Sequence, residues 1–433
     1  MSKGAPKILI ISSCRLSQGP AAIAGQYYDA FCQEGYDTDL LLKYPEPDHP
    51  EYMYVVDESY EKSLFYRIRH SYLWKKFFSK KNLNNKFYLS YSKEKYPPIP
   101  SKVVVNKISK KYDLILIVFW QGLLSFETIQ RIYDKLHCQI HIMGVDYSQM
   151  SGGCHFPGSC DNYVTGCGMC PAICSTDKND FTAWNVRYRK KVYKKVKPIV
   201  YGNQYMHQFY KKSYLLKDAN CELIPSIIID TKLFQPLDSK SCREKYHIPK
   251  EKYILFFACQ NLNDYRKGIS YLLEALIILN EKLGEEKNQI LVITAGNGYE
   301  DIKTQIPFDS IGMGYVPMER LPEIFALSTC FICPSIDDAG PMMVNQSLCC
   351  GKPVVGFEIG SVLQVVKDKG TGYCVPLKDV NKMSDKILEV LKLSTTEYQQ
   401  MQKKCREVAL QTSSYTSQVK LILDTYTKYS EKF

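Results

Sequence analysis

Residues 331–356 read FICPSIDDAGPMMVNQSLCCGKPVVG, and this stretch predicts a strand, an acidic loop, a helix and a second buried strand in succession. The apolar run FIC is closed by Pro334, as the end of a buried strand often is. Gly340 and Pro341 mark a turn, and proline suits the first turn of a helix, where its missing N–H leaves no bond unmade. The helix expected over 342–350 ends at the next glycine. Such a loop presents backbone N–H groups and a helix N-terminus at the carboxyl end of a parallel strand, where α/β sheets bind phosphorylated ligands.

The same stretch is similar to the donor-site signature of the retaining glycosyltransferases of family 4, or group 1, which have the GT-B fold. That signature has an acid, seven residues, a glutamate, and a small-residue helix ending in C-G-x-P-V-V. Asp338 stands at the first acidic position, Gln346 at the second, and residues 350–355 read CGKPVV. The resemblance implies that Asp338 is a catalytic residue contacting the donor sugar, and that position 346 addresses the nucleotide ribose. Gln346 departs from the glutamate, but it still hydrogen-bonds hydroxyls. The alternative is a plain βαβ turn whose acids cap the helix dipole.

The other donor-binding candidates follow from this resemblance. The family carries basic residues that hold the donor diphosphate at a corner where Arg266 and Lys267 stand, just before an expected helix at 270–283. The dipole disfavours a cation beside a helix N-terminus, so the pair favours a bound anion there over plain surface charge. The backbone at 339–342 would stabilise the charge of the leaving diphosphate, so Gly340, Pro341 and Met342 are donor-binding candidates as well.

A further donor-binding candidate is Gly19, in the loop after an expected strand at 7–13. The family has a glycine-containing loop at this point of its first βαβ unit. The loop lacks the G-x-G-x-x-G spacing, so the residues alone do not argue for nucleotide binding, and a plain turn remains the alternative.

The acceptor-side catalytic candidate is Asp146. Many family members read H-D here, followed by six residues and G-C-H; this chain has Val145-Asp146 and then GCH at 153–155. The aspartate matches, and the histidine that would face the donor is absent. An Asx-turn role for Asp146 is the alternative.

Five cysteines crowd an insertion at 151–176 with the spacing C-x5-C-x6-C-x2-C-x3-C. The tight C-G-M-C pair suits a tetrahedral zinc site. A similar G-G-C-H…C…C-G-x-C-P pattern occurs in a subset of the family. The metal ligands predicted on this spacing are Cys154, Cys160, Cys167 and Cys170, with a redox C-x-x-C pair and uncoordinated thiols as alternatives.

Composition limits the partners. The chain has 433 residues, 17 cysteines and a formal net charge of +11. It shows no nucleic-acid-binding signature, signal peptide or membrane-spanning window, so we expect no nucleic-acid partner and a cytoplasmic protein with reduced thiols. Residues 60–112 carry 14 Lys or Arg among aromatics, which favours either a solvated face or peripheral binding to an anionic membrane, at its inner face. A second basic run, 185–197, is interpreted mainly as a solvated face.

The resemblance spans the whole chain and implies an α/β protein of GT-B fold, with two doubly wound Rossmann-like domains facing a cleft. The expected ranges are 1–210 for acceptor binding, 211–410 for donor binding, and 411–433 for a helix crossing back to the first domain. The implied function is retaining transfer of a sugar from a nucleotide sugar to a glycan or lipid-linked acceptor, in polysaccharide or glycolipid biosynthesis, with no catalytic metal. The alternative is a catalytically degenerate relative acting as a scaffold, favoured by Val145, Gln346 and Gln364 (the last again in place of a family glutamate).

Overall fold

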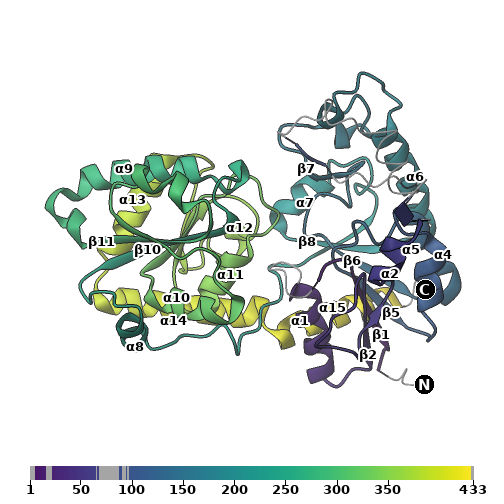
Figure 1. Ribbon diagram of the computed structural model, residues 1–433, viewed down its shortest axis with the longest axis horizontal. Helices are drawn as coiled ribbons and strands as arrows, with labels where there is room; N and C mark the ends of the chain where they lie inside the picture. The colour runs from purple at the N-terminus through teal and green to yellow at the C-terminus, as the bar shows by residue number, and fades with distance from the viewer. Residues whose placement is uncertain are drawn as a thin grey trace. The chain divides into compact units, whose positions relative to one another are not determined.

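The computed structural model describes residues 5–15, 22–64, 66–67, 87–89, 94 and 97–430. The chain divides into two compact units. The first unit comprises Met1–Gly202, Met206–Ile224 and Val419–Phe433, and the second comprises Asn203–Tyr205 and Pro225–Gln418. Each unit has a parallel β-sheet with helices packed on its faces (Figure 1). The predicted α/β class is confirmed.

The sheet of the first unit has the strand order β3-β2-β1-β5-β6-β8-β9. All of its neighbouring strands are parallel. Its central strands are continuous apolar runs buried on both faces, as a helix-covered parallel sheet requires. The strands are β1 (Ile8–Ser12), β2 (Thr38–Leu42), β3 (Met53–Tyr54), β5 (Leu114–Ile117), β6 (Gln139–Met143), β8 (Ile199–Gly202) and β9 (Asn220–Leu223).

The helices of the first unit begin at side-chain caps where the sequence offers them. Ser125 and Thr128 form a reciprocal capping box at the start of α5, and Asp180 accepts backbone N–H bonds at the start of α6. These helices are α1 (Ala22–Gln33), α2 (Glu58–Lys62), α4 (Ser101–Lys107), α5 (Phe126–Leu136) and α6 (Phe181–Val196), together with most of α7 (Gln204–Tyr210) and of α15 (Tyr415–Ser430).

An irregular segment of the first unit follows β6 and contains the five clustered cysteines of the 151–176 range. Its regular parts are β7 (Cys154–Phe156) and two 3-10 turns, η3 (Asn162–Val164) and η4 (Pro171–Ile173). β7 pairs antiparallel with β4 (Tyr88–Leu89), which comes earlier in the chain. The chain then enters α6, whose N-terminal Asp180 also accepts the backbone N–H of Cys170.

The sheet of the second unit has the order β12-β11-β10-β13-β14-β15 and is parallel throughout. Separate hydrophobic cores fill its two faces, one under α9 and α13 and the other under α10, α11 and α14 (Figure 1). The strands are β10 (Tyr253–Asn261), β11 (Ile290–Asn297), β12 (Asp309–Gly312), β13 (Cys330–Cys333), β14 (Val354–Phe357) and β15 (Gly372–Val375). The helices are α8 (Ser239–Lys245), α9 (Ile269–Leu283), α10 (Leu321–Leu327), α11 (Met342–Cys349), α12 (Val362–Val365), α13 (Val380–Leu391) and α14 (Thr395–Ser413).

The elements expected at 331–356 are present as β13, α11 and β14. In the first unit β5 ends at Ile117, because Phe119 adopts a positive φ of 51° that an extended strand cannot include. The ranges 1–210 for acceptor binding, 211–410 for donor binding and 411–433 for a crossing helix stay predictions. The division into compact units does not show what either unit binds.

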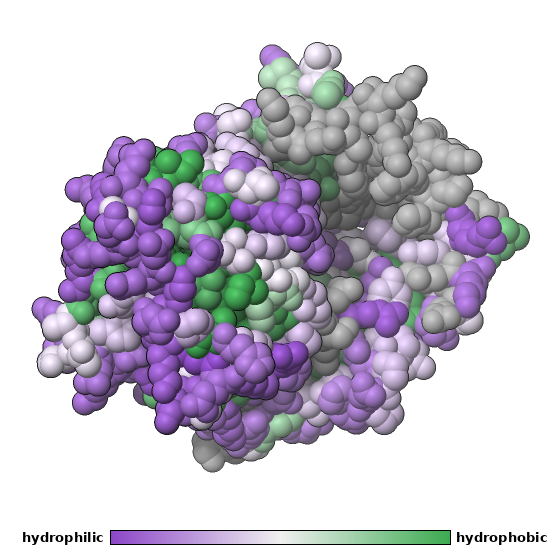
Figure 2. Space-filling model, turned by 60° about the vertical axis from the view of Figure 1, so that its left-hand side comes forward, coloured by the Kyte–Doolittle hydropathy of each residue, from purple (hydrophilic) through white to green (hydrophobic). Residues whose placement is uncertain are grey.

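The basic run at 185–197 differs from its prediction at one residue. Most of its cations lie on the solvated side of α6, but Arg189 is fully buried. Among the described residues, no helix combines the length and apolar character needed to cross a bilayer. Figure 2 shows a largely hydrophilic surface interrupted by smaller apolar areas.

Candidate functional site

Two loops of the second unit meet at the carboxyl ends of β10 and β13. Gly268, at the start of α9, has a φ of +69°, and a Cβ added to it would lie 1.9 Å from the carbonyl oxygen of Pro334. The backbone N–H of Ile336 donates to the carbonyl of Arg266 at 2.8 Å. Glycine is therefore required at 268 for both conformation and space, and the contact brings the basic corner against the acidic loop.

An ion pair joins these loops. Lys267 Nζ donates to Asp338 Oδ2 at 2.5 Å, and Asp338 Oδ1 accepts the backbone N–H of Gly340 at 3.0 Å. Burial disfavours the ammonium of Lys267, but the charge of Asp338 and the hydrogen bond to it outweigh this and raise the pKa of Lys267. The Lys267 ammonium is thus held charged at the C-terminal edge of the sheet, beside an Asp338 side chain that is only 11% exposed.

Arg266 is held by its own loop. Its guanidinium donates to Asp264 Oδ2 at 2.6 Å, and Asp264 Oδ1 accepts the Arg266 backbone N–H at 3.0 Å. Two cations and two carboxylates therefore lie on the touching loops, and Arg266 and Lys267 each contact a carboxylate. An anionic ligand at this corner would compete with those carboxylates for the same donors.

Buried polar atoms without a hydrogen-bond partner lie in and beside α11. They are both amide atoms of Asn345, Oε1 of Gln346 and Oγ of Ser361. Buried polar groups normally have partners, so these atoms are the kind that a ligand or water satisfies. Gly360, next to Ser361, has a φ of +48°, and a Cβ there would lie 3.0 Å from the Asp338 carbonyl oxygen. The ribose role of Gln346 stays a prediction, as do the contacts of Gly340, Pro341 and Met342.

The third departure from the family pattern, Gln364, has a local role. Its Oε1 accepts the backbone N–H of Gln204 at 3.0 Å, at the start of α7. Nearby, Asn203 Nδ2 donates to the Ala339 carbonyl at 2.5 Å. Both bonds lie within the second unit, and they tie the 203–205 segment to the loop that carries Asp338.

Asp146 lies in the first unit, directly after β6, and is 3% exposed. Its Oδ1 accepts the backbone N–H of Ser148 at 2.6 Å, the Asx interaction expected as the alternative. Its Oδ2 contacts two side chains, Gln121 Nε2 at 2.9 Å and His155 Nδ1 at 2.6 Å. Asp146 is therefore more than a turn residue, because both of its oxygens are engaged.

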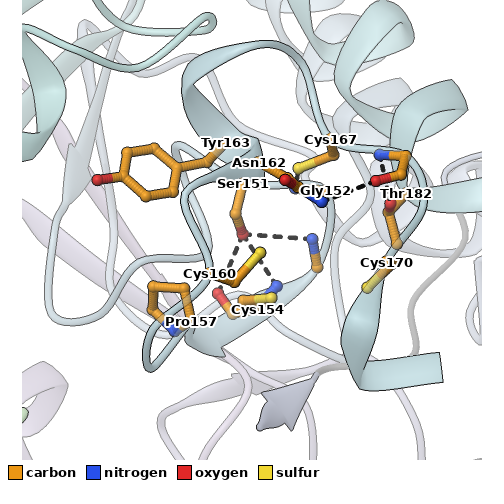
Figure 3. Close-up of a pocket in the computed structure, with 12 residues that line it drawn as sticks. Ser151, Gly152, Cys154, Pro157, Cys160, Asn162, Tyr163, Cys167, Cys170 and Thr182 are labelled. Carbon is orange, nitrogen blue, oxygen red and sulfur yellow. Dashed lines mark hydrogen bonds between the residues drawn. The ribbon is translucent and has the colours of Figure 1, made fainter. Parts of the chain in front are cut away.

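The four cysteines predicted to bind zinc line one pocket of about 20 Å³, shared with Ser151, Pro157, Tyr163 and Thr182 (Figure 3). Cys167 Sγ accepts the backbone N–H of Gly152 at 3.3 Å. Burial raises the pKa of Cys154 and raises that of Cys167 to about 12, which keeps the thiols protonated.

The described residues contain no group of three or more His, Cys, Asp or Glu side chains arranged to hold a metal ion. The zinc prediction is therefore not supported. The cysteines share a pocket without converging on one point, so uncoordinated buried thiols describe them better. The Gly19 prediction falls outside the described residues.

Comparison with known proteins finds a family likeness in the second unit. Residues 238–409 match the family model described as glycosyl transferases group 1. That part of the second unit is therefore similar to the group 1 glycosyltransferase domain. The match includes the Arg266–Lys267 corner, the Asp338 loop and α11.

Curated relatives are similar over part of the chain. The O-antigen chain mannosyltransferase B of Escherichia coli is 27% identical over 163 residues, covering 36% of this chain and 41% of the relative. The alpha-galactosylglucosyldiacylglycerol synthase of Streptococcus pneumoniae is 29% identical over 137 residues, covering 26% and 34%. The chain thus spans less than half the length of either relative.

Solved structures are similar over nearly the whole chain. Anabaena Alr3699/HepE in complex with UDP and glucose aligns with a TM-score of 0.64 at 12% identity, covering 98% of this chain and 99% of that one. At this identity the likeness concerns the fold alone. It confirms the GT-B fold expected from the sequence.

Several residues of these networks were not assigned from the sequence. Asp264, Asn203 and Gln121 are ordinary polar residues that become informative only when their partners are known. Asn345 precedes Gln346 on α11 and belongs to none of the motifs quoted from the sequence. His155 belonged to the quoted GCH motif, and its spacing from Asp146 was the one available signal.

Proposed function

We propose that this protein is a retaining glycosyltransferase that moves a sugar from a nucleotide sugar to an acceptor hydroxyl. The observation that carries the proposal is the Lys267–Asp338 ion pair, which joins the two sheet-edge loops of a group 1 glycosyltransferase domain. Beside it lie Arg266 and the unpartnered polar atoms of α11 and Ser361. This combination offers cations for a diphosphate and hydrogen-bonding groups for sugar hydroxyls.

The donor diphosphate would take Arg266 and Lys267 from their carboxylate partners. Arginine binds phosphate oxygens in a bidentate fork and lysine binds them as a point charge. Asp338, relieved of Lys267, then accepts hydrogen bonds from hydroxyls of the donor sugar. Gln346 serves the nucleotide ribose through its amide, and the N-terminal backbone of α11 lies toward the diphosphate.

In the reaction, the bond from the anomeric carbon to the diphosphate oxygen breaks, and its electron pair leaves with the nucleoside diphosphate. The acceptor oxygen forms the new bond to that carbon on the same face, so the configuration is retained. The acceptor's hydroxyl proton ends on the diphosphate or in solvent. Arg266, Lys267 and the backbone at 340–342 stabilise the charge that grows on the leaving group.

Polysaccharide or glycolipid synthesis supplies the acceptor in this proposal. The relatives support that range, since one is named for O-antigen synthesis and the other for a glycosyl diacylglycerol. Peripheral binding to an anionic membrane at its inner face fits a lipid-linked acceptor, and its sequence basis is the 60–112 stretch. The lysines most concerned, at positions 75, 76, 80 and 81, lie outside the described residues.

Donor binding tests the proposal directly. The protein is heated with UDP-glucose, UDP-galactose, UDP-N-acetylglucosamine or GDP-mannose, and a bound donor at 100 times its Kd should stabilise it by about 2.7 kcal/mol. Arg266→Ala should weaken that binding by about 10-fold or more, since it removes a cation from the diphosphate.

Arg320→Ala is the matched control. Arg320 lies in the same unit and contacts Tyr246 and Glu323, with a side chain 53% exposed. It should leave donor binding unchanged. Equal donor affinity in wild type and Arg266→Ala would place the diphosphate elsewhere.

A further inference from the structure

The first unit contains a histidine–aspartate pair that the donor site does not use. His155 Nδ1 lies 2.6 Å from Asp146 Oδ2, and the imidazole is 23% exposed while the carboxylate is 4% exposed. Gln121 Nε2 donates to the same carboxylate oxygen at 2.9 Å. The pair therefore has a buried acidic end and an imidazole end that reaches solvent.

The contact fixes which imidazole nitrogen carries the proton. A carboxylate only accepts hydrogen bonds, so His155 Nδ1 must be the donor. In the neutral form of the ring the unprotonated nitrogen is therefore Nε2, because the partner of one ring nitrogen sets the role of the other. Within the described part of the chain, Nε2 has no hydrogen-bond partner. It is available to accept one from a ligand.

The ring is held in place by its own strand as well as by Asp146. The Tyr147 backbone N–H donates to the His155 carbonyl at 3.0 Å, which closes the loop between the aspartate and the histidine. The Tyr88 ring packs edge-on against the imidazole with centroids 5.5 Å apart, across the β4–β7 pairing. These contacts leave the imidazole few orientations.

A buried ion pair between Arg189 and Glu94 lies against the same loop. Arg189 donates to the carbonyls of Ser148 at 2.8 Å and Ser151 at 2.6 Å, and to Glu94 Oε1 at 2.8 Å. Both charged side chains are 1% exposed, and the guanidinium also lies over the rings of Trp120 and Phe126. The bonds from Arg189 to the Ser148 and Ser151 carbonyls hold the 146–155 loop in the conformation that places His155 beside Asp146.

We propose that His155 is the acceptor-side catalytic residue, whose Nε2 accepts a hydrogen bond from the acceptor hydroxyl, and that Asp146 is its positioning residue. The inference rests on the proposed glycosyl transfer and deepens it. It supplies an imidazole in a chain that has valine at position 145, where the resemblance led us to expect histidine. The acceptor class is thus an alcohol, a sugar or lipid hydroxyl, whose proton points at Nε2.

The role of the histidine is to aim the hydroxyl. The hydrogen bond to Nε2 fixes the hydroxyl proton and leaves an oxygen lone pair free for the anomeric carbon. The bonds made and broken at the anomeric carbon are those of the transfer already given. The hydroxyl proton passes to Nε2 as the new bond forms, and the imidazolium then releases it to solvent. Loss of such orientation costs about 100-fold in rate.

Three variants in the full-length chain test the assignment, with octyl glycosides as acceptor probes and the donor that binds best. His155→Phe keeps the ring against Tyr88 and removes both nitrogens. We expect kcat to fall about 100-fold while the donor Kd stays within about 2-fold. His155→Gln, whose amide reaches toward the Nε2 position, should recover at least 10-fold of that loss. Asp146→Asn should give an intermediate rate, since an amide no longer fixes the tautomer.

His49→Phe is the matched control, because His49 forms a comparable pair with Glu51 at 3.1 Å on the exposed surface. It should transfer like wild type. A purely structural role for His155 would lower the unfolding temperature and the donor affinity of all site variants together, with no rescue by glutamine. That pattern, or wild-type kcat in His155→Phe, overturns the inference.

The outcomes also separate this inference from the proposed function. Failure of the wild-type chain to bind or transfer from any nucleotide sugar defeats the proposed function itself. Normal transfer by wild type and His155→Phe alike defeats only the role of His155. If His155→Phe does not fold, His155→Gln decides: a kcat/KM for the acceptor reproducibly below wild type, with the donor Kd unchanged, supports the role, and an unchanged kcat/KM removes it.

Discussion

Replacing Asp338 by asparagine keeps the shape of the side chain and removes the charge that pairs with Lys267. A hydrogen bond to a charged group contributes about 1.5–3 kcal/mol. The two side chains are 11% and 25% exposed, so water screens the pair only in part. We expect Asp338→Asn to destabilise the second unit by about 2 kcal/mol, which lowers the unfolding temperature of a unit of this size by about 4–8 °C.

The pH dependence of this effect has a definite sign. The pKa of Lys267 is raised in the folded chain, so the stabilisation from the pair is fully present below the unfolded lysine value of 10.5. It is lost as the pH rises through the higher folded value. The difference between wild type and Asp338→Asn should therefore be constant from pH 7 to 9 and shrink only in stronger alkali.

A double-mutant cycle with Lys267→Met isolates the pair. Urea unfolding of the four chains should give a coupling energy of about 2 kcal/mol. The exposed pair of Lys282 and Asp385, whose side chains are 33% and 54% exposed, is the control and should couple by less than about 1 kcal/mol. Coupling below about 0.5 kcal/mol at the Lys267 pair would refute the reasoning. The turnover number of Asp338→Asn should fall by about 10²–10³-fold, because Asp338 also accepts hydrogen bonds from the donor sugar in the proposed mechanism. A stability loss of about 2 kcal/mol alone would leave the folded variant active.

Three further predictions concern other parts of the chain. Burial lowers the pKa of Lys352 to about 8, so the folded chain binds fewer protons than the unfolded chain between about pH 8 and 10.5. Stability should rise by about 3 kcal/mol over that window. Lys352→Met should flatten the rise in urea unfolding, and an unchanged rise would assign it to other groups. Purified protein should hold well below one zinc per chain by elemental analysis, whereas one zinc that Cys167→Ser removes would contradict the pocket described. The protein should float with anionic liposomes and dissociate as salt screens the basic stretch. Equal binding to neutral vesicles would exclude that role for the lysines, which serine substitution tests at positions 75, 76, 80 and 81.

The sequence was most informative where local and long-range requirements coincide. At 331–356 the apolar runs, the Gly-Pro turn and the glycine after the helix each admit few conformations, so β13, α11 and β14 could be predicted closely. The strand expected at 7–13 is present as β1 for the same reason, since a helix-covered parallel strand is a continuous apolar run. The end of β5 is not readable from the sequence, because no glycine or proline marks the positive φ at Phe119.

The site could be predicted only as far as its residues carried a motif. Arg266, Lys267 and Asp338 were named, but their pairing depends on the contact of Gly268 with Pro334, which is a tertiary property. Likewise Arg189 belonged to a run that charge patterning assigns to solvent, and its burial depends on Glu94, far away in the sequence. The cysteine spacing predicted a metal site because it limits how far apart the thiols can lie. Spacing does not fix the directions of the side chains, so the prediction could not be decided from the sequence.

The central claim is catalysis by the proposed donor site in residues 238–409, the part that matches the group 1 glycosyltransferase model. Release of nucleoside diphosphate measures it most directly. The wild-type chain and Asp338→Asn are each incubated with the four nucleotide sugars and the octyl glycosides, and the diphosphate is quantified by chromatography. The account predicts acceptor-dependent release by the wild type from at least one donor, and release slowed at least 100-fold in the variant. A wild-type chain that binds a donor but releases no diphosphate, or a variant that releases it equally fast, would contradict the account and favour the catalytically degenerate alternative.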